Sequence, residues 1–366
     1  LKQYRLKNYH FQLVVYIIAL SIIGILLIGS AKHSVQSKQI IGFVMGLTIM
    51  IVLSLIDYTF LLKFVWIYYA GMIVLLLLVL FAGDDAKGAQ RWFEIGSFRF
   101  QPSELAKILI ILFFAYFFMK HEEKINTPKV LILSFVLAGI PLALILKQPD
   151  LSTTIVTALI FAALLFVAGL SYKIVIGVLA VSIPSAVIMF TLLIQDKLPF
   201  IKSYQVTRVM AWLYPDDYPA DAYQQQNSIM AIGSGQLWGK GLNNTDATSV
   251  KNGNFIPEPQ TDFIFAVAGE ELGFIGTVII IILLLFITIE CILIARKAKD
   301  TAGKMICCGF AALVGFQSLV NIGVASGVLP NTGLPLPFVS YGLTSLLSLY
   351  IGVGLVLNVG LQPKKY

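Results

Sequence analysis

Asp262 is the most informative ionisable residue of the sequence, because a polar segment changes into an apolar one at this position. Residues 257–261 before it are polar, and residues 263–267 after it are apolar. A carboxylate at such a boundary lies where a water-filled loop meets membrane hydrocarbon, and it is costly there unless it is paired or used. Two compatible interpretations are open. Asp262 caps a helix that begins with Phe263, or its charge is used in the function of the protein.

Two basic residues in the first half of the chain could bind an anionic group. Arg91 precedes Trp92, and Arg binds phosphate in a bidentate manner while Trp favours the membrane interface. Lys107 follows Glu104 by three residues, so the two side chains can meet on one helix face. A structural ion pair and an anion-binding lysine that faces a cavity are both open for Lys107.

Three further basic residues are candidates of the same kind. Lys147 begins a short connection, residues 147–153, that contains Asp150, and a turn with a Pro and an Asx cap explains much of this connection without explaining the lysine. Arg208 lies in the amphipathic stretch 204–214, which predicts a helix lying along the interface.

Lys240 lies in a glycine-rich stretch, residues 233–241, that superficially resembles a phosphate-binding loop. Gly241 follows the lysine where that motif requires Ser or Thr. We therefore expect glycine turns near the membrane surface, from which Lys240 can contact a phosphate.

The composition identifies an integral membrane protein. Of the 366 residues, 58% are hydrophobic and 12% are charged, whereas soluble domains carry about 25% charged residues. The sequence predicts an all-α fold, a single membrane domain over residues 1–366, with about ten transmembrane helices. The expected spans are 11–30, 39–57, 63–82, 103–119, 129–146, 152–169, 171–193, 272–295, 304–326 and 340–361.

The distribution of Lys and Arg predicts the orientation of the chain. Connections on the side of the termini carry more than twice as many of these residues as the opposite connections, when the long segment 195–261 is left out. Both termini are therefore expected in the cytoplasm. Residues 195–261 then form a large extracytoplasmic loop, and Asp262 lies at the outer face of the membrane.

The other composition features exclude two kinds of function. The net charge of +7 is scattered over loops and forms no basic stripe with aromatics, so anionic lipid explains it better than nucleic acid. The three cysteines, Cys291, Cys307 and Cys308, have spacings of neither a metal site nor a disulfide framework. We expect them to be packing residues.

Residues 327–342 form an outer connection that has no charge and is rich in Pro and Gly. A non-helical segment this apolar is tolerated at membrane depth only where it is buried in protein or lines a cavity. We interpret it as a re-entrant wall. Glu270 and Glu271 stand at the entrance to the eighth span, and adjacent acids point in different directions on a helix, so at most one is expected to face the same cavity as Asp262.

In this order, these segments resemble the SEDS family, the RodA, FtsW and SpoVE proteins of bacterial wall synthesis, over essentially the whole chain. The residues that carry the resemblance are Gly88 to Trp92, Gln101 to Glu104 with Lys107, Lys147 to Ser152, Gly239 to Gly241, Thr261 to Phe263, Glu270 to Gly273 and Gly333 to Gly342.

The resemblance implies a peptidoglycan glycosyltransferase in the bacterial cytoplasmic membrane, active in cell shape or cell division. It would polymerise lipid II into a nascent glycan strand by inverting transfer, release undecaprenyl pyrophosphate, and work with a class B penicillin-binding protein and other elongation or division complex membrane proteins. The family's essential aspartate matches Asp262, as the general base that activates the 4-hydroxyl of the acceptor sugar. The other candidates, for substrate binding, are Arg91, Glu104, Lys107, Lys147, Asp150, Arg208, Lys240, Glu271 and Ser340.

Two questions stay open from the sequence. The departing pyrophosphate needs cationic stabilisation, and a divalent cation, Mg²⁺ or Mn²⁺, could share that task with the basic residues, although no clustered ligand set is present. The second question is the class of protein. A lipid II flippase would use Asp262, Glu104 and Lys107 as gating charges, and a scaffold that only positions its partner would leave the buried charges unexplained.

Overall fold

The structure of the chain is a computed structural model that describes residues 8–86, 89–96, 98–194, 203–244, 249, 253 and 255–362. Gly88 of the shared motifs and the first part of the predicted 195–261 loop, residues 195–202, lie outside the described residues. The fold is mostly helical, as expected. Its helices in order are α1 Phe11–Ala31, α2 His33–Leu55, α3 Tyr58–Leu61, the 3₁₀ helix η2 Leu62–Phe64, α4 Val65–Ala82, α5 Pro102–Lys120, the 3₁₀ helix η3 Glu122–Lys124, α6 Pro128–Lys147, α7 Leu151–Val167, α8 Tyr172–Ile194, α9 Ser203–Leu213, α10 Pro219–Ser234, α11 Ile264–Lys297, α12 Thr301–Ala325 and α13 Leu343–Leu361.

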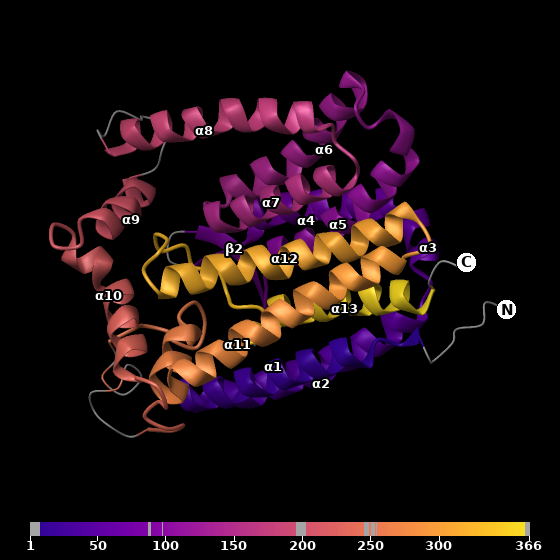
Figure 1. Ribbon diagram of the computed structural model, residues 1–366. Coiled ribbons are helices and arrows are strands. Elements are labelled where there is room, and N and C mark those ends of the chain that lie inside the picture. Colours follow the sequence, from indigo (N-terminus) through magenta and orange to yellow (C-terminus); the bar gives the residue numbers. More distant parts are fainter. Residues whose placement is uncertain are drawn as a thin grey trace.

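Within the described chain, eight helices are long and apolar enough to cross a membrane, counting α3 to α4 as one. Apolar helices α7 and α8 occupy the sixth and seventh predicted spans, so the ten-helix prediction is confirmed in order. The long helices run side by side, and α1 begins at the end of the bundle where α13 ends (Figure 1). The 327–342 segment lies at the opposite end, which we call the outer end.

Helices α5, α12 and α13 form the centre of the bundle. Most of their residues are buried within the protein, whereas α2, α4 and α6 bury less than a third of theirs and present Leu, Ile and Val outward. Helix α5 begins with Pro102 at its first turn and Glu104 within that turn, which suits the free N–H groups and the positive end of the helix dipole. The central helices therefore carry the buried polar residues described below.

A small antiparallel sheet precedes α5, which the all-α prediction did not include. Its strands are β1 Asp84–Ala86, β2 Ala89–Ile95 and β3 Phe98–Phe100, in the order β1-β2-β3. An exposed ion pair joins Glu94 of β2 to Arg99 of β3 (Oε1 to Nε, 2.6 Å), and these two residues are opposite each other in the register. The sheet carries Arg91 to the outer end of the bundle.

Helices α9 and α10 cover the outer end, and α8 stands apart from the other helices (Figure 1). Helix α9 coincides with the interface helix predicted over 204–214, whereas α10 was not predicted. Both are anchored to the end of α12. Trp212 of α9 donates from Nε1 to the Gly327 carbonyl at 2.8 Å, and Ser228 of α10 donates to the Ala325 carbonyl at 2.7 Å.

Helix α11 is interrupted at Gly273, whose φ of 66° and ψ of −165° are non-helical and favour glycine. The turn after α10 bonds to the backbone groups that the break releases. The Phe274 N–H donates to Gln236 O at 2.8 Å, and the Lys240 N–H donates to Glu270 O at 2.9 Å. The glycine-rich stretch 233–241 is therefore a structural connection to the α11 break.

Candidate functional site

The candidate site is organised by the 327–342 segment, which the sequence predicted as a non-helical wall. From Ser326 to Gly342 it contains no helix, and Leu334, Leu336, Phe338 and Val339 are buried. Its backbone carbonyls accept hydrogen bonds from side chains of five different helices, α2, α7, α9, α10 and α12. The segment thus joins residues that are far apart in the sequence.

Asp262 lies two residues before α11 and is half-buried. The N-cap position is Phe263, which forms no side-chain cap, so the interpretation of Asp262 as the cap of a helix starting at Phe263 is wrong. Gly333 lies beside the carboxylate: a Cβ atom built on this glycine would be 3.3 Å from Asp262 Oδ2. The φ of Gly333 is 76°, so glycine suits this position in both backbone conformation and space.

The two residues before Gly333 bind the neighbouring helices. Ser152 of α7 donates from its hydroxyl to the Thr332 carbonyl. Arg208 of α9 is exposed and donates from Nη1 to the Asn331 carbonyl at 3.5 Å. Arg208 and Asp262 are therefore brought to adjacent parts of one segment.

Ser340 fastens the peptide before Asp262 to the same segment. Its Oγ donates to the Thr261 carbonyl at 2.6 Å and accepts from the Leu336 N–H at 2.7 Å. The Tyr341 N–H donates to the Gln260 carbonyl at 2.8 Å. Ser340, predicted as a substrate-binding residue, here organises the backbone around Asp262.

Two amide side chains of α12, which the sequence did not single out, also bond to backbone carbonyls of the site. Asn321 donates from Nδ2 to the carbonyls of Asp262 (2.8 Å) and Leu334 (2.6 Å). Gln317 donates from Nε2 to the Pro335 carbonyl at 2.9 Å. The available signal was a pair of amides four residues apart within an apolar span, because such groups face the same side of a helix and must find partners in a membrane.

Glu104 and Lys107 form the ion pair that was one of the two interpretations of their spacing. Lys107 Nζ lies 2.8 Å from Glu104 Oε1 and donates to Gln317 Oε1 at 2.7 Å. The Lys107 side chain is 2% exposed. The ammonium thus faces Glu104 and Gln317, and it reaches the 327–342 segment only through the Gln317 amide.

Arg91 and Asp150 meet at the turn between α6 and α7. The Arg91 guanidinium donates from Nε to the Gln148 carbonyl at 2.9 Å and from Nη2 to the Pro149 carbonyl. Asp150 caps α7 by accepting from the Thr153 N–H at 3.1 Å, and it accepts from Gln101 Nε2 at 3.2 Å. Lys147 is exposed at the end of α6, and the described part of the chain offers it no hydrogen bond or ion pair.

Lys240 and Glu271 lie in a different part of the outer end. Lys240 Nζ pairs with Glu270 Oε1 at 2.9 Å, and Glu271 Oε1 accepts from the Ser30 hydroxyl at 2.6 Å. Both acids are buried. Glu271 is about 10 Å further along α11 than its first residue, at 1.5 Å per residue, and it faces α1. The described contacts do not connect Lys240 or Glu271 to Asp262.

The described residues contain no group of three His, Cys, Asp or Glu side chains that could hold a metal ion. Cys291, Cys307 and Cys308 are free thiols, and the first two are buried, which confirms their assignment as packing residues. No ligand set for the divalent cation considered from the sequence is assigned among these residues.

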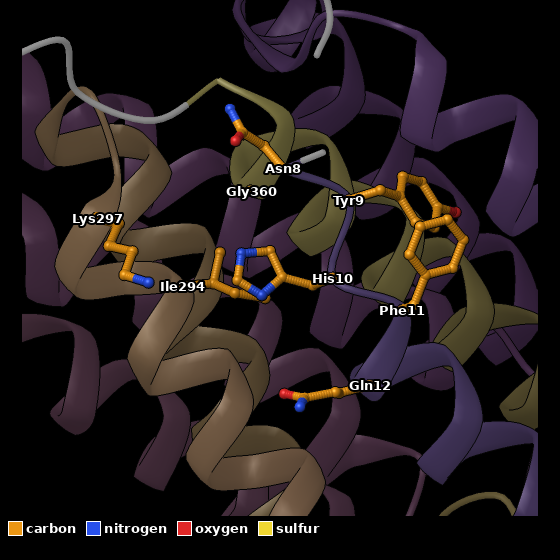
Figure 2. Close-up of a pocket in the computed structure, with 8 residues that line it drawn as sticks. All are labelled: Asn8, Tyr9, His10, Phe11, Gln12, Ile294, Lys297 and Gly360. Carbon is orange, nitrogen blue, oxygen red and sulfur yellow. The ribbon is translucent and has the colours of Figure 1, made fainter. Parts of the chain in front are cut away.

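Two hollows lie outside the Asp262 site. A groove of ≈ 380 Å³ between α1 and α11 is lined by Ile23, Trp238, Gly241, Leu242, Glu271, Leu272, Ile275, Gly276 and Ile279. A hollow of ≈ 320 Å³ lies at the other end of the bundle, where the His10 ring faces Ile294 of α11 (Figure 2). His10 Nδ1 is 2.8 Å from Glu290 Oε1, so its imidazole is part of a local pair far from Asp262.

Comparison with known protein sequences identifies relatives over the whole chain. Residues 5–365 match the family described as "Cell cycle protein", whose members are FtsW, RodA and SpoVE. The chain is 33% identical to the probable peptidoglycan glycosyltransferase FtsW of Geobacter metallireducens, over 98% of this chain and 96% of the relative. It is 37% identical to the peptidoglycan glycosyltransferase MrdB of Escherichia coli K12, over 95% of this chain and 92% of the relative.

Comparison with solved structures gives the same result for the fold. A chain of a peptidoglycan synthase complex, described for its coordination of polymerization and crosslinking, has a TM-score of 0.78 at 30% identity, with 96% of this chain and 97% of that chain covered. The crystal structure of the rod shape determining protein RodA of Thermus thermophilus has a TM-score of 0.69 at 28% identity, with 96% of each chain covered.

Proposed function

The chain belongs to the FtsW, RodA and SpoVE family of multi-pass bacterial membrane proteins and is a peptidoglycan glycosyltransferase, and from this premise we propose that it joins lipid II units with Asp262 as general base. In the proposed step, the 4-hydroxyl of the acceptor sugar attacks the anomeric carbon of a lipid-linked donor. The bond from that carbon to the pyrophosphate oxygen breaks with inversion, and undecaprenyl pyrophosphate leaves.

The surroundings of Asp262 support its assignment as the base. The carboxylate is half-buried and lies beside Gly333, where the missing side chain leaves space for a sugar hydroxyl to approach. The backbone on both sides of the carboxylate is held by Ser340 and Asn321. A fixed carboxylate within reach of a hydroxyl is what general base catalysis requires.

Arg208, Arg91 and Lys147 are the proposed contacts for the pyrophosphate. Arg208 reaches the residue two positions before Gly333, so it is the cation most directly linked to Asp262. Arg91 and Lys147 lie at the α6 to α7 turn, which Ser152 connects to the same segment. Cations here would stabilise the charge that develops on the leaving group.

We assign the remaining candidates supporting roles. Glu104 and Lys107 hold Gln317, Asp150 caps α7, and Ser340 holds Thr261. Lys240 and Glu271 fasten the α11 break to its neighbours. A divalent cation would have to be held mainly by pyrophosphate oxygens, so no step is assigned to it.

The proposed partners follow from the relatives. A chain of similar fold comes from a peptidoglycan synthase complex that coordinates polymerization with crosslinking. We therefore propose a class B penicillin-binding protein as the partner that crosslinks the strands, together with other elongation or division complex membrane proteins. Lipid II and the nascent glycan strand are the proposed substrates, and we propose that both termini lie in the cytoplasm.

The test is glycan synthesis from lipid II by the purified chain, alone and with its class B penicillin-binding protein. The wild type is expected to form polymer, and Asp262→Ala is expected to form none while keeping its thermal unfolding temperature in detergent. Polymer from the folded Asp262→Ala protein would remove the base assignment. Movement of lipid II across a liposome bilayer, without polymer from either protein, would replace the enzyme with the transporter alternative.

A further inference from the structure

Asn321 of α12 is a buried amide whose hydrogen bonds join two separate segments of the site. Its side chain is 1% exposed. Both hydrogen bonds of its Nδ2 go to other elements, one to the Asp262 carbonyl at 2.8 Å and the other to the Leu334 carbonyl at 2.6 Å. One amide group therefore connects the general base to the residue that follows Gly333.

The chemistry of the two acceptors determines the orientation of the amide. Both are backbone carbonyl oxygens, which only accept hydrogen bonds, so the Asn321 group facing them must be the NH₂ group. The Oδ1 atom has no hydrogen-bond partner in the described part of the chain. If the NH₂ group were removed, two buried carbonyls would lose their donor, and each such loss is costly in a low-dielectric interior.

The hydrogen bond from Asn321 to the Asp262 carbonyl determines where the Asp262 carboxylate lies. Asp262 Oδ2 is the atom that a Cβ on Gly333 would approach to 3.3 Å, and Gly333 is bonded covalently to Leu334. Ser340 connects the same two segments from the other side, through the Thr261 carbonyl and the Leu336 N–H. The Asp262 backbone is therefore held between two clamps, of which Asn321 bonds to the Asp262 carbonyl and Ser340 to that of Thr261.

Gln317, one turn before Asn321, supports the same segment. Its Nε2 donates to the Pro335 carbonyl at 2.9 Å, and its Oε1 accepts from Lys107 Nζ at 2.7 Å. The face of α12 that carries Gln317 and Asn321 is thus continuous with the buried Glu104 and Lys107 pair. This arrangement gives the segment beside Asp262 a rigid support deep in the bundle.

We infer that Asn321 is a positioning residue for glycosyl transfer, which fixes the Asp262 carboxylate relative to the 327–342 segment. The inference rests on the proposed role of Asp262 as general base. Asn321 holds the base and is assigned no contact with substrate, so its loss reduces kcat and leaves KM near the wild-type value. A displacement of about 1 Å can cost 10²-fold in rate, and we expect a loss of about that size.

The experiment compares Asn321→Leu and Asn321→Asp with the wild type, in the full chain with its class B partner and with lipid II as substrate. Both replacements are close to Asn in size and lack the NH₂ group. Asn321→Gln, which keeps an amide donor on a longer side chain, is expected to recover part of the lost kcat. Thermal unfolding of each protein is measured in the same detergent.

Asn358 of α13 provides the matched control. It is also a fully buried amide, and its Nδ2 donates to the Ser54 carbonyl at 2.8 Å, far from the site. Asn358→Leu is expected to lower the unfolding temperature to a similar extent without reducing kcat in the protein that remains folded. If kcat of Asn321→Leu falls no further than that of Asn358→Leu, or if KM rises instead, the inference is overturned.

Two further outcomes separate the inference from its premise. If Asp262→Ala keeps its activity, the base assignment fails and the inference fails with it. If Asp262→Ala is inactive while all Asn321 variants keep the wild-type kcat, the proposed function stands and only the inference is lost. If Asn321→Leu does not fold, Asn321→Asp and Asn321→Gln test the inference instead. A purely structural amide would give equal kcat in every folded variant, whereas a positioning residue would give a lower kcat in Asn321→Asp than in Asn321→Gln.

Discussion

The two ends of the helix bundle both contain buried polar networks, but the networks use their carboxylates differently. At the end near the termini, Asp57 and Asp300 both cap helices. Asp57 accepts from the Thr59 N–H at 2.9 Å, and Asp300 accepts from the Gly303 N–H at 2.7 Å. The Tyr58 hydroxyl donates to Asp300 at 2.8 Å. These carboxylates bond to helix N-termini and to a neighbouring tyrosine, and so they hold helices together.

At the outer end, the aspartate that precedes a helix does not occupy the N-cap position. Asp262 also precedes a helix, but Phe263 takes the N-cap position of α11 and forms no side-chain cap. The surrounding polar side chains bond to backbone carbonyls of the 327–342 segment and of Thr261 and Asp262. These hydrogen bonds hold the Asp262 backbone, and the carboxylate lies beside Gly333. Two aspartates that cap helices are thus compared with one for which we propose a catalytic role.

The largest expected effect comes from replacing one aspartate at each end by alanine. Asp262→Ala should lower glycan synthesis by about 10² to 10⁴-fold, the usual contribution of a general base, with little change in unfolding temperature. Asp300→Ala should do the reverse, with full activity and a loss of about 1 to 2 kcal/mol from the missing cap. Polymer assays and thermal unfolding of both proteins test this. Loss of activity in a folded Asp300→Ala protein would break the comparison.

The next effect concerns the buried pair that supports the outer end. Lys107→Met leaves the Glu104 carboxylate buried without its cation, which costs about 3 to 5 kcal/mol. The double variant Glu104→Gln with Lys107→Met should recover much of that stability, because both charges are removed. The unfolding temperatures of the wild type, Lys107→Met and the double variant show how much stability is recovered when both charges are removed. Equal loss in the single and double variants would show that the pair is not the source of the effect.

Gly333→Ala tests the space beside the carboxylate. The new Cβ would lie 3.3 Å from Asp262 Oδ2 at a φ of 76°, so we expect a strain of about 1 to 3 kcal/mol together with reduced turnover. Gly169→Ala is the control, because its φ of 95° gives similar strain and nothing lies within 4 Å of the added Cβ. A similar loss of turnover in both variants would remove the argument that Gly333 makes room for the acceptor.

The smallest effect is expected at the exposed cation. Arg208→Ala should raise the KM for lipid II several-fold, because an exposed charge contact contributes only about 1 kcal/mol, and higher salt should reduce the difference between the two proteins. Lys240→Ala, which breaks the ion pair with Glu270, should change stability more than KM. The KM values for lipid II of Arg208→Ala and Lys240→Ala, measured at low and high salt, show which of the two cations contributes more to substrate binding. An unchanged KM in Arg208→Ala would argue against its contact with pyrophosphate.

Several features could be predicted from local sequence because neighbouring residues determine them. The apolar runs predicted the helices and their order, the amphipathic stretch predicted α9, and the three-residue spacing of Glu104 and Lys107 predicted their pair. The absence of charge and the Pro content identified the 327–342 segment as non-helical before its contacts were known. Each of these depends on periodicity or on contacts within one turn of helix.

Other features were missed or wrong, because they depend on distant parts of the chain. The break at Gly273 is stabilised by residues 236–241, and the sheet before α5 pairs short strands in a region assigned to a loop. Local sequence left a capping role for Asp262 open beside a functional one, and the position of Phe263 at the N-cap excludes the capping role. The amides Gln317 and Asn321 looked like isolated polar residues in an apolar helix until their carbonyl partners were known.

The sequence by itself determined that this chain is a helical membrane protein of the FtsW, RodA and SpoVE family, since composition and motif order are properties of the chain alone. It also singled out Asp262, because the change from polar to apolar residues is local. Only the tertiary structure decided what surrounds Asp262. Asn321 and Ser340 donate to the backbone carbonyls of Asp262 and Thr261 across 59 residues or more, and Gly333 lies beside the carboxylate. Buried polar groups in a membrane must find partners, and the fold selects which ones they find.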